Sequence, residues 1–110
     1  MPNGEIDELK EKFVECLSPI KIYLFGSFAE GKQNDNSDFD FYIVVNDNEK
    51  DIVDLTIRAY KSIRKIKQRP VDIVVSTRQR FEERKEIPSV ENEVVSKGVL
   101  IYGEWGSCMG

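Results

Sequence analysis

Two aspartates one residue apart are the groups in this chain best suited to chemistry. Asp38 and Asp40 lie in an apolar run rich in aromatic and β-branched residues, which predicts a strand over residues 38–45. Side chains alternate between the faces of a strand, so both carboxylates point the same way, roughly 6.6 Å apart. Like charges held together are costly to desolvate and need a cation or open water. A divalent metal is the simpler explanation.

A third acid stands in the next expected strand, over residues 71–76. Asp72 is the one charged residue among Val71 to Ser76, where burying a lone carboxylate would be expensive. If this strand neighbours the one that carries Asp38 and Asp40, the three acids converge. Three carboxylates and no histidine form an oxygen-rich ligand set, which favours Mg²⁺ or Mn²⁺ over zinc.

A Gly-Ser turn ends the strand expected over residues 20–25. Gly26 has no side chain and lets the backbone approach phosphate oxygens, and Ser27 can donate its hydroxyl. A short helix expected over residues 27–30 would aim free N–H groups at the same anion. The two aspartates could bridge two metals roughly 3.5–4 Å apart. Together with the Gly-Ser turn, such a site indicates metal-dependent phosphoryl transfer. In it, Asp72 would hold the metal beside the acceptor hydroxyl and take its proton.

Each of these signals has a plainer interpretation when taken alone. A Gly-Ser pair is a common turn, and Asp72 alone could be an acid at the start of an edge strand. The Asp-x-Asp pair could be surface acids or part of a calcium loop, although the aromatic residues around it favour a strand. The ordered combination is more specific than any part.

Composition limits the other possibilities. The 110 residues fit one domain over residues 1–110, with a tail expected over 104–110, and the net charge of −4 argues against general nucleic-acid binding. The absence of histidine excludes Ser-His and Cys-His mechanisms. Cys16 and Cys108 form no metal-binding pattern and are expected to be reduced thiols. We see no signal peptide and no membrane-spanning run, so we expect a cytoplasmic protein.

The hydrophobic periodicity predicts an α+β domain, with α/β character, in which helices flank a small mixed sheet. The expected helices begin near residue 6, at Glu49, near Arg78 (ending at Glu86) and after Pro88. The last of these would have Val90, Val94 and Val95 on its apolar side. A final strand over residues 99–102 is expected at a sheet edge. Basic residues between Arg58 and Arg69 predict a solvated helix face or, less simply, a binding surface.

Gly26-Ser27, followed after ten residues by Asp38-Phe39-Asp40 and later by Asp72, resembles the DNA polymerase β-type nucleotidyltransferases. More narrowly, the chain resembles the minimal nucleotidyltransferases. The resemblance implies the polymerase β-like palm fold and transfer of a nucleoside monophosphate from a triphosphate, such as ATP, to a hydroxyl. It implies that the three aspartates are catalytic metal ligands and that Gly26 and Ser27 contact phosphate. Members often have a basic residue soon after Gly-Ser; here Lys32 is the nearest one and is added to the phosphate-binding residues.

The resemblance also implies a biological setting. Minimal nucleotidyltransferases are commonly paired with a helical HEPN protein as antitoxin and toxin, and some transfer AMP to a tyrosine of that partner. The alternative is an antitoxin that neutralises its partner by contact alone. A third hypothesis is an RNA or small-molecule nucleotidyltransferase that works as a homo-oligomer. Contact with RNA bound to the partner stays open.

Overall fold

The computed structural model describes residues 4–26, 38–66 and 70–103. The elements in these ranges are α1 (Gly4–Leu17), β1 (Lys21–Phe25), β2 (Phe39–Val45), α2 (Ile52–Ile63), β3 (Val71–Thr77), α3 (Arg78–Arg84), α4 (Val90–Lys97) and β4 (Val99–Tyr102). No helix in the described ranges is long and apolar enough to cross a bilayer. The helix expected over residues 27–30, Cys108 and the tail lie outside the described residues.

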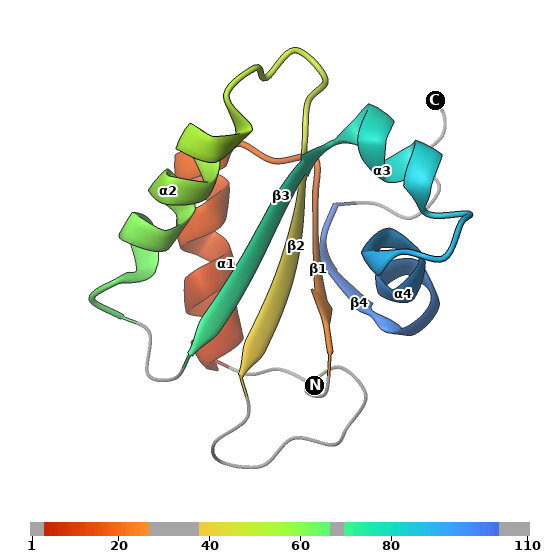
Figure 1. Ribbon diagram of the computed structural model, residues 1–110. Helices are drawn as coiled ribbons and strands as arrows, with labels where there is room; N and C mark the ends of the chain where they lie inside the picture. Colours follow the sequence, from red (N-terminus) through yellow and green to blue (C-terminus); the bar gives the residue numbers. More distant parts are fainter. Residues whose placement is uncertain (1–3, 27–37, 67–69, 104–110) are drawn as a thin grey trace.

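The strands form one mixed sheet in the order β3-β2-β1-β4 (Figure 1). β1 is antiparallel to both of its neighbours, whereas β2 and β3 are parallel and are joined through α2. The edge position expected for the last strand is confirmed. The expectation that the strand with the paired aspartates neighbours the strand with the third acid is also confirmed. The observed architecture is the predicted α+β fold.

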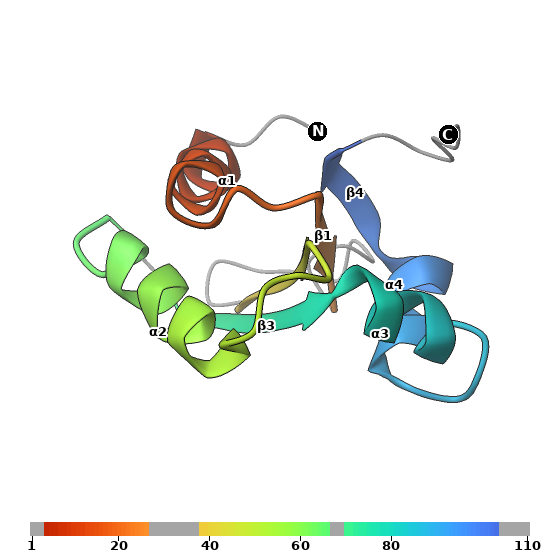
Figure 2. The ribbon, with the colours of Figure 1, turned by 90° about the horizontal axis from the view of Figure 1, so that it is seen from above.

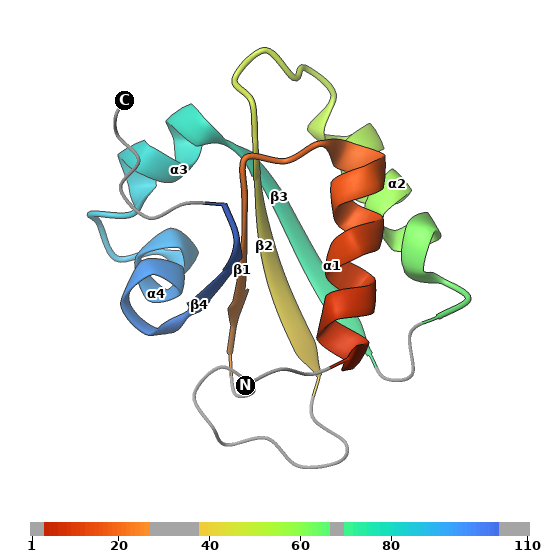
Figure 3. The same cartoon turned by 180° about the vertical axis from the view of Figure 1, so that it is seen from behind.

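Helices cover both faces of the sheet. Seen from above, α1 and α2 lie on one side and α3 and α4 on the other (Figure 2). The view from behind shows α1 in front of the sheet, beside α2 (Figure 3). The alternating side chains of the central strand therefore enter two separate apolar clusters.

The larger cluster lies under α1 and α2. Phe39, Phe41 and Ile43 of β2 are fully buried in it, as the alternation predicts, and Phe13 meets Phe41 edge-on at a ring-centroid distance of 5.2 Å. The smaller cluster lies under α3 and α4. Its buried members are Tyr23, Tyr42, Val44, Phe81 and Val94. Asp40 and Asp72 belong to this second face, because they alternate with the residues of the first.

Side-chain caps define the starts of three helices. Asp51 accepts a hydrogen bond from the backbone N–H of Asp54 at 2.9 Å, so α2 begins at Ile52 and the expected start at Glu49 is wrong. Thr77 caps α3 by accepting a hydrogen bond from the backbone N–H of Arg80 at 3.3 Å. Ser89 caps α4 through the N–H of Asn92 at 3.1 Å. The caps fix where each helix leaves the sheet.

The apolar face expected for the last helix is partly wrong. Val94 is fully buried, but Val90 and Val95 are 48% and 38% exposed. The buried neighbour of Val94 is Glu91, whose carboxylate is hydrogen-bonded inside the smaller cluster. The buried side of α4 therefore contains the hydrogen-bonded acid Glu91, whereas a prediction from hydrophobicity alone places Val90 and Val95 there.

Candidate active site

Gly26 ends β1 in a conformation that suits glycine. Its φ of +83° lies in the left-handed region, where other residues are strained. A Cβ added there would overlap Oδ2 of Asp40. The Asp40 carboxylate therefore lies against the backbone of Gly26, and the turn and the acid form one unit.

Asp40 and Asp72 are register partners on the parallel strands β2 and β3. Adjacent strands are about 4.8 Å apart, and both side chains face the side of α3 and α4. Asp72 is exposed and Asp40 is partly buried. The sheet therefore holds these two carboxylates side by side, as the sequence led us to expect.

The surroundings of Asp40 disfavour its charged form. The pKa of Asp40 is raised to about 6, mainly by burial and further by the charge and hydrogen bond of Asp72 and the charges of Asp38 and Glu93. A bound cation would remove this penalty, because it attracts the carboxylates that repel one another. The oxygen donors fit a hard ion such as Mg²⁺ or Mn²⁺.

Asp38 departs from the expected geometry. It directly precedes β2 and is exposed, although its charge reaches Asp40. Across the described ranges, no three acidic, cysteine or histidine side chains are arranged to hold one metal ion. The expected convergence of three acids is therefore only partly formed. The physical reason is that Asp38 stands one residue before the strand whose pairing fixes Asp40.

Two of the expected phosphate-binding residues, Ser27 and Lys32, lie outside the described residues. One residue near the site was missed by the sequence analysis. Glu93 of α4 contributes negative charge at Asp40. No local pattern in the sequence points to it, since its position depends on how α4 packs back over β1.

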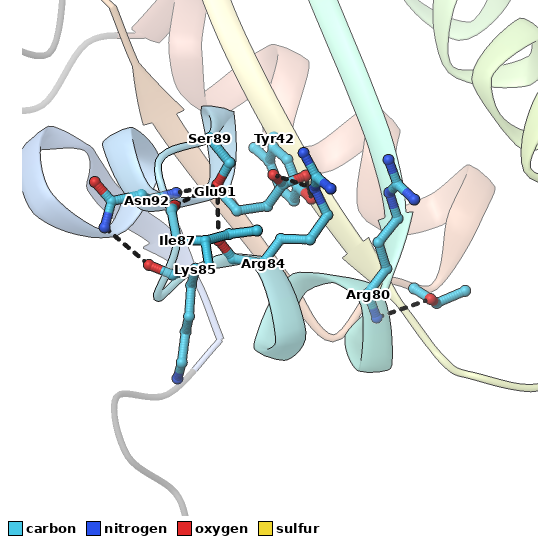
Figure 4. Close-up of polar contacts among 9 residues, drawn as sticks. Tyr42, Arg80, Arg84, Lys85, Ile87, Ser89, Glu91 and Asn92 are labelled. Atoms are coloured by element: carbon cyan, nitrogen blue, oxygen red, sulfur yellow. Dashed lines mark hydrogen bonds and ion pairs between the residues drawn. The ribbon is translucent and has the colours of Figure 1, made fainter.

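A polar network fixes α4 against the sheet. The hydroxyl of Tyr42 donates to Oε2 of Glu91 at 2.7 Å, and Nε of Arg84 donates to Oε1 at 3.1 Å (Figure 4). Burial raises the pKa of Tyr42. Burial alone would also raise the pKa of Glu91, but the hydrogen bonds from Tyr42 and Arg84 lower it. The network thus joins β2, α3 and α4 through one ionised carboxylate.

Comparison with known families gives the class of the protein. The family model of the nucleotidyltransferase domain matches residues 6–101, and the chain belongs to this family. Its members transfer a nucleoside monophosphate from a triphosphate to an acceptor and release pyrophosphate, so the chain is classed as a nucleotidyltransferase. The resemblance found in the sequence is confirmed at this level. No curated protein matches the chain.

Solved structures agree with the fold. A candidate nucleotidyltransferase from Sulfolobus solfataricus has a TM-score of 0.59 at 19% identity, with 92% of this chain and 79% of that chain covered. A toxin–antitoxin structure with AMP-PNP has a TM-score of 0.56 at 23% identity, with 96% and 76% covered. A mutant of the toxin–antitoxin MntA-HpeT, with two aspartates replaced by glutamate, has a TM-score of 0.54 at 21% identity, with 96% and 76% covered. These likenesses show that the chain shares the fold of these proteins.

Proposed function

We propose that the chain is a divalent-metal-dependent nucleotidyltransferase that transfers AMP from ATP to a hydroxyl of a partner protein. The observation that carries the proposal is the pair Asp40 and Asp72, held side by side on parallel strands with Asp40 against Gly26. A structural role does not require two adjoining carboxylates at the end of a sheet. A metal site does.

The site residues have separate roles in this proposal. Asp38, Asp40 and Asp72 hold one or two Mg²⁺ or Mn²⁺ ions, which supply charge neutralisation at the phosphates. Asp38 completes the ligand set when its side chain turns toward the pair. Gly26 lets the triphosphate approach the backbone, and Ser27 and Lys32 contact its oxygens.

The transfer itself is a displacement at phosphorus. The acceptor oxygen forms a bond to the α-phosphorus of ATP, and the bond from that phosphorus to the bridging oxygen breaks. Pyrophosphate leaves with the electron pair, and Asp72 takes the proton of the acceptor hydroxyl. Asp72 is suited to this step because it is exposed on the edge strand β3, where an acceptor can reach it.

Two of the similar structures are toxin–antitoxin complexes, which supports a partner protein as the acceptor. We assign that partner to the HEPN class on the sequence resemblance. AMP-PNP in one of those structures supports ATP as the donor.

The test is a labelling assay with ATP labelled at the α-phosphate. The chain is incubated with its co-expressed HEPN partner and MgCl₂, and label on the partner is measured together with released pyrophosphate. We expect stoichiometric label that is lost with EDTA and falls at least a hundredfold with Asp40→Asn or Asp72→Asn. Asp7→Asn, the same chemical change at an exposed position of α1, is the control. Equal labelling by Asp40→Asn would refute the enzymatic proposal.

The second candidate is an antitoxin that acts by contact alone. The toxin–antitoxin neighbours are compatible with it, because steric inhibition needs no catalysis. The partner's toxic activity separates the two candidates. Inhibition that persists in Asp40→Asn with no label on the partner supports the contact mechanism. Inhibition that disappears together with the label supports the enzyme.

A further inference from the structure

The helix α2 carries an exposed apolar stripe. Val53 is 70% exposed, Ile57 47% and Tyr60 38%. Their spacing of four and then three residues places them on one side of the helix. A different side of α2 is buried in the core through Leu55, Ala59 and Ile63. The helix is therefore apolar on two sides, and only one of them is used within the chain.

The stripe borders the open edge of the sheet. The hydroxyl of Tyr60 accepts a hydrogen bond from the backbone N–H of Ile73 at 3.0 Å, which ties the stripe to the edge strand β3. α2 lies along this edge on the far side of the sheet from α3 and α4 (Figure 2). Asp40 and Asp72 face the α3 and α4 side, so the stripe is separate from the candidate active site.

The charges at the two ends of the stripe have opposite signs. Acids predominate before and at the start of α2, where Glu49, Asp51 and Asp54 outnumber Lys50. Basic residues end it, at Lys61, Arg64 and Lys65. When two such helices pack antiparallel, each acidic end meets the basic end of the other, whereas a parallel pair would place like charges together.

This pattern is complementary to itself. In a two-fold arrangement the same patch serves both subunits, so an apolar centre with opposite charges at its ends satisfies both copies at once. Within α2, Asp54 lies in the first turn and Lys61 in the last, three residues before and four residues after Ile57. A two-fold axis near Ile57 would therefore bring Asp54 of one copy level with Lys61 of the other.

We propose that this stripe is the contact between two copies of the chain, with α2 packed antiparallel against α2 across a two-fold axis. The contact leaves Asp40 and Asp72 of each copy free, because they lie on the other face of the sheet. An interface built around one helix pair is small, so we expect reversible dimers in the micromolar range.

Sedimentation equilibrium of the purified full chain, from about 5 to 500 μM, tests the apolar centre. We expect twice the chain mass of 12.7 kDa at the upper concentrations. Ile57→Asp should weaken the dimer at least about tenfold, since it places a charge in the contact. Ile87→Asp is the matched control, because Ile87 has the same 47% exposure but lies between α3 and α4. A wild-type chain that stays monomeric throughout, or equal weakening by both variants, overturns the proposal.

A charge exchange tests the two-fold pairing directly. Asp54→Lys and Lys61→Asp should each weaken the dimer several-fold, and the double variant should regain wild-type affinity. Restoration in the double variant requires the two residues to meet across copies. A double variant that is as weak as, or weaker than, the single variants overturns the antiparallel arrangement. Thermal melting followed by circular dichroism verifies that each variant is folded.

Discussion

The carboxylate of Asp40 lies over the backbone of Gly26, in the space that any side chain at residue 26 would need. The contact joins the end of β1 to the start of β2, where Phe25 and Asp40 are register partners. Asp40 is in turn the register partner of Asp72. A change at residue 26 therefore acts on the acidic pair directly.

Replacing Gly26 by alanine should damage activity more than stability. The positive φ costs an alanine about 1–2 kcal/mol, and its Cβ must displace the Asp40 carboxylate. We expect a similar loss in the free energy of unfolding, measured in urea, and at least a hundredfold loss of transfer. Gly4→Ala is the control, because nothing lies within 4 Å of a Cβ added there. Full activity in Gly26→Ala would mean that the contact between Gly26 and the Asp40 carboxylate does not matter for transfer.

Removing the charge of Asp40 should stabilise the metal-free protein at neutral pH. The pKa of Asp40 is raised to about 6 from 3.8, so the folded state binds the proton more tightly than the unfolded state. Stability from this group is therefore full below about pH 4 and is lost as the pH rises through 6. Because Asp40 is only partly buried, we expect Asp40→Asn to gain about 1 kcal/mol at pH 7.5 and nothing at pH 4.

Thermal melts in EDTA at both pH values measure this effect. A gain of about 1 kcal/mol corresponds to roughly 4 °C for a domain of this size. Asp7→Asn should show no such pH-dependent gain. Destabilisation of Asp40→Asn at pH 7.5 would mean that the carboxylate has a structural partner that opposes the repulsion.

Magnesium should stabilise the folded wild-type chain, because the ion offsets the repulsion between Asp40 and Asp72. Binding to the folded state alone at ten times the dissociation constant stabilises by about 1.4 kcal/mol. We expect MgCl₂ to raise the melting temperature of the wild type, but not that of Asp40→Asn or Asp72→Asn. NaCl at equal ionic strength is the control for screening. An equal rise in all three proteins would place the ion elsewhere.

The Glu91 network should stabilise the packing of α4. Glu91→Leu leaves the Tyr42 hydroxyl without its acceptor in the smaller cluster, so we expect a loss of about 2–3 kcal/mol at pH 7. Because the pKa of Glu91 is lowered on folding, its contribution should fall as the pH drops below the unfolded value. Urea unfolding of Glu91→Leu, Tyr42→Phe and the double variant measures both the loss and the coupling. Strict additivity would contradict a direct bond.

The sequence predicted the positions of Asp40 and Asp72 well, because they follow from the alternation of side chains within one strand. Alternation placed Asp40 opposite Phe39 and Phe41, and it placed Asp72 opposite Ile73. Both predictions hold because a strand has a period of two wherever it pairs. Asp38 falls just outside that pairing, so alternation within the expected strand could not place its side chain.

The long-range features could not be predicted in this way. Glu91 can be buried because two residues donate hydrogen bonds to its carboxylate. Tyr42 is distant in the sequence, and Arg84 is on another helix. Glu93 approaches Asp40 because α4 returns over β1, and Gly98 permits close contact there with Leu24 and Phe25. Such contacts depend on the completed fold rather than on any residue pattern.

The position of β3 at the border of the sheet has a consequence for the size of the acceptor. Among the described residues, Asp72 is flanked by a strand on one side only, and its carboxylate is exposed. Under the proposed function, this open flank would let a bulky acceptor such as a folded protein present its hydroxyl to Asp72. Discrimination among acceptors would then depend on the surface of the arriving molecule.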